Sequence, residues 1–434
     1  MRRGTALVAL TILALATGCS AKGGDGGETS AGGSDGAPKV TITPADAAGE
    51  AAPDRGVTVT AEGGTLSQVS VRAGGAEVPG ALAADHRTWR TTWSLKPGTR
   101  YEVSAKADGK KTSTTATSRF TTSAATAATK ISQIVPATGE TVGVGMPIFV
   151  QFNKEVPVKA RTAIERALEV KSDKPTEGGW RWLSAGESFN GLPSVVFRPR
   201  KPWKPRQKVT VTAHYAGLRI GDAVFGDKDV THTFRIGDSH IITVSATTDR
   251  LTVKKNGRVV RSWGVSLGSG GDVQSDGIDH QLTTSGVHLT MNKVRLERMR
   301  PPGKKKGDPG WYDEKVPWAY RISNSGEYIH QNMDDPSCLG NRNCSHGCVR
   351  SPAADAQWFF NWAYPGDMVT ITGTKRKLEW TNGWGYWQLP FDQWVQGGRL
   401  KKPVTTAPRT PATPTAPATD APAGTNAGPE TGTP

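Results

Sequence analysis

Long hydrophobic runs are scarce in this sequence, and their scarcity limits the fold classes that it can form. Only 36% of the 434 residues are hydrophobic, and the apolar run from Ala6 to Ala16 is too short to span a bilayer as a permanent helix. Glycine and threonine are abundant instead. This composition favours short strands and turns over long helices. Since the length allows about two to four domains, we expect a mostly β protein.

Acidic residues are fewer than basic ones, 39 against 54, which gives a formal net charge of +15. A basic protein favours anionic partners, and nucleic acid is the usual candidate. The N-terminus indicates export, however, because Arg2 and Arg3 precede the apolar run. An exported basic protein meets anionic wall polymers and lipid head groups. We therefore expect no nucleic-acid partner.

The end of the apolar run suggests a lipid anchor. Ala16-Thr17-Gly18-Cys19 resembles a bacterial lipobox, in which the cysteine is acylated and becomes the mature N-terminus. The alternative is a plain secretory signal in which Cys19 is incidental. We expect residues 1–19 to be a lipoprotein signal peptide. Lipid on Cys19 would hold the protein at the cell membrane, on the extracytoplasmic face within the cell wall.

Cysteine is also rare, with four residues: Cys19, Cys338, Cys344 and Cys348. Export places the last three in an oxidising setting, where disulfides form and persist. Pairing two of them leaves one free thiol. An odd cysteine in a secreted protein requires a specific explanation.

Two segments have the pattern of β-sandwiches, residues 38–124 and 130–237. Each contains a proline turn followed by apolar alternation of period two, at 96–105 and 204–213, which is typical of a half-buried strand. Short strands with frequent turns over about 100 residues favour a sandwich. The likeness between the two segments has chance as its alternative explanation. Neither holds a cluster of reactive residues, so we assign them a spacer or positioning role.

The chain on either side of these segments is poor in apolar residues. Residues 20–37 are mainly Gly, Ser, Asp and Ala, which is typical of a flexible tether. Residues 403–434 are rich in Pro, Thr and Ala without apolar periodicity, which predicts a disordered tail.

A third domain is expected over residues 238–376. Leu251 to Trp263 predicts a hairpin around Asn256-Gly257, a favoured two-residue turn. Ser351-Pro352 predicts the start of a helix that runs to about Tyr364, with serine as its cap and proline in its first position. We expect the short segment 377–402 to pack on this domain.

The densest chemistry in the sequence lies around Cys348. A thiol near its reference pKa of about 8.5 is mostly protonated at neutral pH. A nearby imidazole, here His330, can take its proton or stabilise the thiolate. Gly347 lets the backbone approach a substrate closely, and the amides of Gly347 and Cys348 can donate to a developing oxyanion. This combination predicts nucleophilic catalysis.

These residues carry a family resemblance. Ser345-His346-Gly347-Cys348-Val349-Arg350, with His330 upstream, resembles the signature of the L,D-transpeptidase (YkuD-type) domain over roughly residues 240–375. Thr284-Ser285-Gly286-Val287 is similar to a further segment of that family. The two preceding β-domains and the closing segment are similar to actinobacterial lipoprotein members. The resemblance implies two immunoglobulin-like sandwiches and then a β catalytic domain with one main helix and a short C-terminal extension.

The resemblance also implies roles for individual residues. Cys348 is the nucleophile, His330 is its base, and the carbonyl of Gln331 orients that histidine. Tyr312 directs its hydroxyl at the oxyanion site, beneath a flap formed by residues 291–309. Ser345, His346 and Arg350 line the substrate pocket.

Five of these residues have other interpretations. Cys348 could be a buried structural thiol, and His330 could be a satisfied core histidine. Arg350 could pair with Asp355 on the following helix, Tyr312 could be a packing residue, and His346 could only orient the loop.

The cysteines next to the nucleophile allow two arrangements. Cys338, Cys344 and Cys348 could form a zinc site with His330 and His346, but the spacing lacks a C-x₂-C knuckle. A disulfide between Cys338 and Cys344 closes a small loop and leaves Cys348 as the free thiol. We favour the disulfide and expect no metal ligand here.

The resemblance implies peptidoglycan stem peptides as donor and acceptor. Attack by Cys348 would release D-Ala and leave a thioester, and the amine of a second stem would resolve it into a 3→3 cross-link. This reaction needs no cofactor, and the resemblance implies carbapenem β-lactams as inhibitors. The alternatives are an L,D-carboxypeptidase, in which water resolves the thioester, and a wall-binding lipoprotein without activity.

Overall fold

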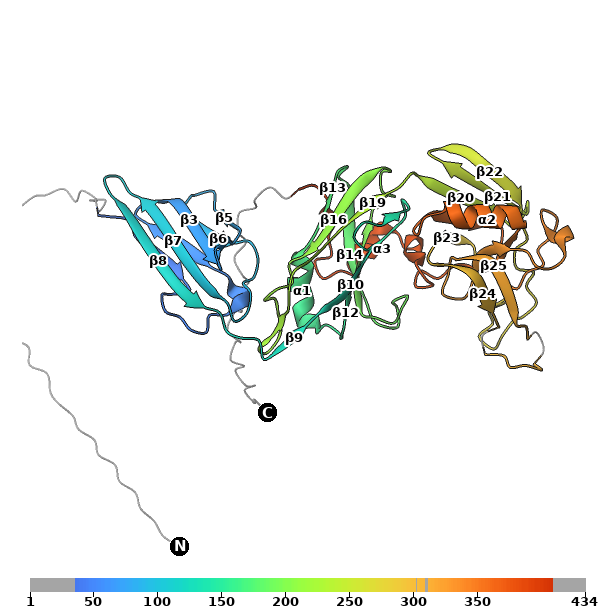
Figure 1. Ribbon diagram of the computed structural model, residues 1–434, viewed down its shortest axis with the longest axis horizontal. Coiled ribbons are helices and arrows are strands. Elements are labelled where there is room, and N and C mark those ends of the chain that lie inside the picture. The colour runs from blue at the N-terminus through green and yellow to red at the C-terminus, as the bar shows by residue number, and fades with distance from the viewer. Residues whose placement is uncertain (1–35, 302, 309–310, 409–434) are drawn as a thin grey trace, which may run out of the picture.

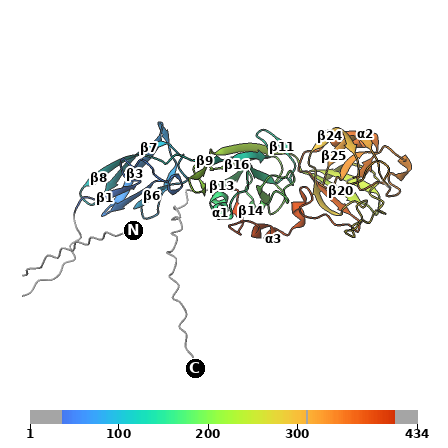
Figure 2. The same cartoon turned by 90° about the horizontal axis from the view of Figure 1, so that it is seen from below.

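The computed structural model describes residues 36–301, 303–308 and 311–408. The predicted signal peptide with Cys19, most of the tether and residues 409–434 of the tail lie outside these ranges. The described residues form three β-rich bodies in a row, as two perpendicular views show (Figures 1 and 2). No helix among them is both long and apolar enough to cross a membrane.

The first body is a sandwich of two four-stranded sheets with a short 3-10 helix, η1 (Pro53–Arg55), at one edge. One sheet has the order β1 (Lys39–Thr43), β2 (Thr58–Glu62), β6 (Thr88–Thr91), β5 (Gly80–Leu82). The other has the order β4 (Ala76–Glu77), β3 (Thr65–Ala73), β7 (Arg100–Asp108), β8 (Ser113–Thr121). Strict alternation along β7 turns Tyr101, Val103 and Ala105 into the core between the sheets.

The second body is also a sandwich. Its first sheet contains β10 (Ile131–Val135), β12 (Ile148–Phe152), β15 (Ser194–Pro199) and β14 (Glu177–Leu183). Its second sheet contains β11 (Thr141–Val142), β19 (Val230–Ile236), β16 (Gln207–Ala213) and β13 (Leu168–Ser172). A small sheet of β9 (Ala127–Thr129), β18 (Val224–Gly226) and β17 (Arg219–Gly221) faces the first body, and α1 (Val158–Arg166) precedes β13.

The third body carries the predicted chemistry. A five-stranded sheet has the order β22 (Arg258–Gly264), β21 (Arg250–Lys255), β20 (His240–Ser245), β28 (Met368–Thr372), β23 (Gly286–Leu289). A four-stranded sheet has the order β24 (Lys293–Met299), β25 (Glu314–Arg321), β26 (Tyr328–Gln331), β27 (Val349–Ser351). The 3-10 helix η2 (Pro336–Cys338) and the helix α2 (Ala353–Trp362) complete it.

Local features of this domain test the sequence predictions. Asn256 and Gly257 both have positive φ angles in the β21–β22 turn, so the hairpin prediction is confirmed. The helix is also confirmed, but its predicted cap is wrong. Pro352 is the N-cap residue, and the Ser351 hydroxyl instead accepts a hydrogen bond from the Trp263 indole at 3.0 Å.

The C-terminal extension joins the second and third bodies. It contains η3 (Gly385–Gln388), α3 (Phe391–Gln396) and β29 (Val404–Thr405). It begins on the catalytic domain, where η3 contacts β23, and then crosses so that α3 packs on β14. β29 pairs with the edge of β14, which corrects the expected start of the tail at residue 403. The segment 377–402 therefore packs on the second sandwich as well as on the catalytic domain.

Candidate active site

Two parallel strands bring the predicted nucleophile and base together. β26 pairs with β27 so that His330 lies opposite Arg350, and Cys348 directly precedes β27. Parallel pairing of neighbouring strands therefore joins residues that lie 18 positions apart in the sequence. His330 and Cys348 both line one cavity of about 380 Å³.

The Cys348 thiol is uncharged in this environment. Its Sγ donates to the carbonyl of Gly326 at 3.6 Å, on the turn that precedes β26. Burial raises the pKa of the thiol to about 12, and a hydrogen bond from the Tyr328 backbone amide opposes this only in part. The predicted nucleophile is therefore a thiol at rest, and an attack by its sulfur would need a base.

His330 is suited to be that base. Its Nδ1 lies 2.6 Å from the Gln331 carbonyl. A carbonyl only accepts, so Nδ1 carries the proton and Nε2 is left with its lone pair. Burial lowers the pKa of His330 to about 4, so the imidazole is neutral at physiological pH. The predicted contact with Gln331 is present, and its catalytic role remains a prediction.

The loop before Cys348 is held by its own hydrogen bonds. The Ser345 hydroxyl donates to the Cys348 carbonyl at 2.6 Å and accepts from the Gly347 amide at 3.2 Å. The Gly347 amide, predicted as an oxyanion donor, is therefore already engaged. Gly347 has a φ of 124°, which side chains rarely adopt. Ser345 thus positions Cys348, and Gly347 provides the turn.

Two supporting residues were not found from the sequence. The Thr283 hydroxyl donates to the Gly347 carbonyl at 2.8 Å and accepts from the Gly268 amide at 2.8 Å. An added Cβ at Gly268 would lie 2.0 Å from the Gln281 carbonyl, so that backbone approach requires glycine. Neither residue belongs to a recognisable motif, and only the fold brings them to the loop.

Tyr312 and His346 form one wall of the cavity. Their rings stack with centroids 4.8 Å apart and an interplanar angle of 13°. Burial raises the pKa of Tyr312 to about 12, with a further contribution from the nearby Cys348. The same packing lowers the pKa of His346 by desolvation. Tyr312 therefore keeps its hydroxyl proton and can donate it, while it also packs against the loop.

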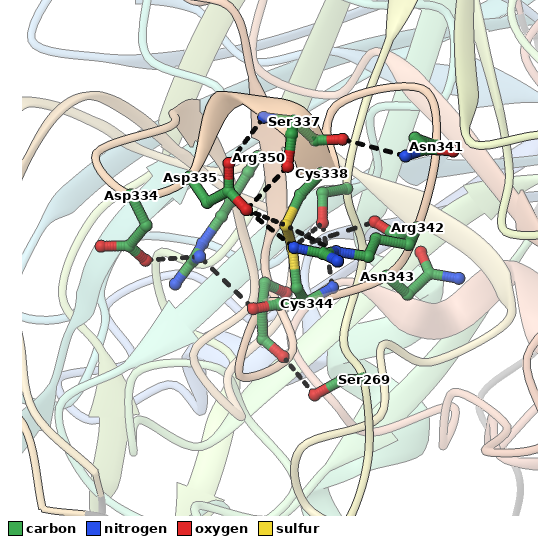
Figure 3. The surroundings of a disulfide bond; sticks show 12 residues. Ser269, Asp334, Asp335, Ser337, Cys338, Asn341, Arg342, Asn343, Cys344 and Arg350 are labelled. Atoms are coloured by element: carbon green, nitrogen blue, oxygen red, sulfur yellow. Dashed lines mark hydrogen bonds and ion pairs between the residues drawn. A yellow bond between two sulfur atoms is a disulfide. The ribbon is translucent and has the colours of Figure 1, made fainter.

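Arg350 is buried and ion-paired beside the disulfide. Its Nη1 lies 2.5 Å from Asp334 and donates to the Cys344 carbonyl at 3.4 Å (Figure 3). The alternative pairing with Asp355 is wrong, because that carboxylate binds Arg261 at 2.6 Å. Arg350 also lines the cavity, so its guanidinium connects the cavity wall to the loop that contains Cys344.

Cys338 and Cys344 form a disulfide, as predicted. Cys348 is the free cysteine among the described residues. The zinc alternative is wrong, since its first two sulfur ligands are joined to each other. In the described ranges, no three His, Cys, Asp or Glu side chains form a group that could hold a metal ion.

The predicted flap contributes charge as well as cover. It contains β24, which pairs with β25 next to the cavity. The charged side chains there were not singled out from the sequence. The charged residues that line the cavity are Glu297, Arg298 and Arg300 in the flap, and Glu314, Arg321, Glu327 and Arg376 outside it. In the sequence they are dispersed over 80 positions without a shared motif.

Comparison with known protein families agrees with this geometry. Residues 239–371 match the L,D-transpeptidase catalytic domain, and residues 48–219, across both sandwiches, match the bacterial Ig domain. The predicted fold class is confirmed: immunoglobulin-like domains followed by a β catalytic domain. The matched catalytic domain supports the assignment of this chain to the transpeptidase class of acyltransferases.

Individual relatives define the family. The chain is 33% identical to L,D-transpeptidase 2 of Mycobacterium tuberculosis, over 83% of this chain and 85% of that protein. It is 31% identical to L,D-transpeptidase 5 of the same species, over 85% of this chain and 78% of that protein. A solved L,D-transpeptidase in complex with imipenem is 26% identical, covering 56% of this chain and 99% of that chain with a TM-score of 0.46. The chain belongs to the L,D-transpeptidase family.

Proposed function

We propose that this chain is a peptidoglycan L,D-transpeptidase that forms 3→3 cross-links through a thioester on Cys348. The observation that carries the proposal is the pairing of a free thiol with an uncharged imidazole in one cavity. Such a pair can perform acyl transfer by nucleophilic attack with general-base assistance. The donor is a tetrapeptide stem, and the acceptor is an amine of a neighbouring stem.

In the first half-reaction, Nε2 of His330 takes the thiol proton while the sulfur attacks the carbonyl that precedes the terminal D-Ala. The thiol hydrogen must first turn away from the Gly326 carbonyl. The Cys348 amide and the Tyr312 hydroxyl are the proposed donors to the oxyanion. His330 then protonates the D-Ala nitrogen, the C–N bond breaks, and a thioester remains.

In the second half-reaction, the acceptor amine attacks the thioester carbonyl. The C–N bond forms, and the C–S bond breaks. Neutral His330 accepts a proton from the amine and returns it to the departing sulfur. The products are a new amide and the restored thiol, so each cross-link releases one D-Ala.

We further propose that the protein is anchored by lipid on Cys19 at the extracytoplasmic face of the cell membrane, within the wall. The support is the order of the N-terminal features: Arg2 and Arg3, an apolar run, and small residues that lead to the cysteine. In chain order, the two sandwiches separate that anchor from the catalytic domain.

The test is incubation of the purified chain with tetrapeptide muropeptides, followed by mass spectrometry. We expect cross-linked dimers that have lost one D-Ala, and imipenem added to the peptide that contains Cys348. Cys348→Ala should give neither product while keeping the wild-type circular dichroism spectrum. Shortened stems without dimers would identify a carboxypeptidase. Imipenem bound to folded Cys348→Ala would refute the assigned nucleophile.

A further inference from the structure

β24 and β25 form a hairpin, and its charged side chains lie on two different faces of that hairpin. The register places Glu297 opposite Val316 and Met299 opposite Glu314. Since side chains alternate along a strand and directly opposed residues share a face, these four side chains lie on one face of the hairpin. Arg298 and Lys315, which oppose each other in the same register, lie on the other face.

The face with the glutamates is turned toward the cavity. Val316 is buried, and both Met299 and Cys348 pack against the small core that it forms with Tyr328. Glu297 and Glu314 line the same cavity as Cys348.

Two arginines of this segment share one carboxylate. Arg298 and Arg300 both bind Asp313, with distances of 2.7 Å and 2.9 Å. The hairpin therefore places two carboxylates in the cavity of Cys348, where Arg298 and Arg300, which line the same cavity, are ion-paired with Asp313.

These two carboxylates are free to bind a ligand. Neither Glu297 nor Glu314 has a hydrogen-bond or ion-pair partner among the described residues, although both side chains are partly buried. The third carboxylate of the cavity, Glu327, is satisfied by the amide and hydroxyl of Thr284, at 2.6 Å and 2.8 Å. Partly buried carboxylates without a partner favour a cation.

We propose that Glu297 and Glu314 bind the ammonium group of the acceptor stem and so select an amine over water as the acyl acceptor. This inference rests on the proposed function and assigns the second substrate to the flap side of the cavity. The bound ammonium loses one proton to solvent, and the amine formed attacks the thioester. Its second proton passes through His330 to the sulfur. The glutamates determine specificity by binding and take no part in proton transfer.

The test measures how a preformed acyl-enzyme divides between amine transfer and hydrolysis. The acyl-enzyme is made with a tetrapeptide donor and then mixed with one of two acceptors. One is a second stem that carries an ammonium group, and the other is hydroxylamine, which is uncharged at neutral pH. In the double variant Glu297→Gln, Glu314→Gln, the ratio of transfer to hydrolysis should fall on the order of 10- to 100-fold for the cationic acceptor. The ratio for hydroxylamine should not change.

Asp313→Asn provides the matched control. It removes the same charge from the residue next to Glu314, but this residue does not line the cavity, and the variant should keep the wild-type ratio. The proposal is overturned if the double variant keeps the wild-type ratio, if it loses both acceptors equally, or if Asp313→Asn gives the same loss. Failure of the wild-type protein to form any acyl-enzyme would instead overturn the proposed function. The ratio is measured after acylation, so slow acylation cannot imitate the expected result.

Discussion

At the scale of single residues, burial sets the charge state of the catalytic pair. It raises the pKa of Cys348 to about 12 and lowers that of His330 to about 4. Both shifts favour the uncharged form, since desolvation penalises thiolate and imidazolium alike. The resting site therefore contains a thiol and a neutral imidazole, and the proton must move during attack.

This charge state predicts the pH dependence of acylation. His330 can act as a base only while unprotonated, so wild-type acylation by imipenem should decline only as the pH falls toward 4. His330→Ala should lose about 10²–10⁴-fold in rate at neutral pH. Part of that rate should return as the pH rises, because hydroxide then ionises the thiol. The measurement is the acylation rate against pH, followed by mass spectrometry.

His346→Ala is the control for this assignment. His346 stacks on Tyr312 and orients the loop, so its loss should slow acylation without recovery at high pH. The opposite pattern, with His330→Ala unchanged and His346→Ala restored by alkali, would show that the base is His346.

At the scale of elements, the disulfide fixes the loop that leads to the nucleophile. Cys338 and Cys344 are six residues apart, and the Cys344 carbonyl also accepts from Arg350. Replacing both by alanine should cost about 2 kcal/mol in the free energy of unfolding, as expected for a small closed loop. Acylation should slow because Arg350 loses an ordered partner.

The measurement for this variant is denaturant unfolding of the catalytic domain together with the imipenem acylation rate. Peptide mapping without reductant should find the Cys338–Cys344 bond in wild-type protein. Cys348 recovered in a disulfide from active protein would contradict both the pairing and the mechanism.

The C-terminal extension is a second element with a testable role. Trp394 is fully buried and its indole donates to the Gly179 carbonyl of β14 at 2.9 Å. Trp394→Ala should destabilise the second sandwich by about 3–5 kcal/mol, as large-to-small core substitutions do. Gln396→Ala, on the exposed side of the same helix, should change stability by less than about 0.5 kcal/mol. Calorimetric unfolding of both variants measures these changes. It shows whether the C-terminal extension stabilises the second sandwich or is only loosely attached to it.

Element boundaries were only partly predictable. Alternation identified the sandwich strands because half-buried strands repeat every two residues. The β29 pairing could not be found in this way, since its two residues lie in a segment with the composition of a disordered tail. Pairing with the edge of β14, more than 220 positions earlier in the chain, orders this segment.

At the scale of the whole molecule, three bodies in a row carry the catalytic site at the end remote from the first sandwich (Figure 1). If lipid is attached to Cys19, extraction of native protein should require detergent. Cys19→Ala should release the protein or block its processing, because the acyl chains provide the membrane affinity. Fractionation of cells and mass spectrometry of the mature N-terminus measure both effects. An unmodified N-terminus downstream of Cys19 would exclude the anchor.

The sequence by itself determined the mostly β class and the order of the domains, and it singled out Cys348 and His330 as the proposed catalytic pair. These properties follow from local alternation, turn residues and a contiguous motif, all of which are encoded over short stretches of chain. Only the tertiary structure decided that Arg350 binds Asp334, that the extension crosses to the second sandwich, and that Glu297 and Glu314 line the same cavity as Cys348. Each of these depends on which strands pair and in which register. Long-range pairing is governed by the packing of the whole chain, and no short sequence pattern encodes it.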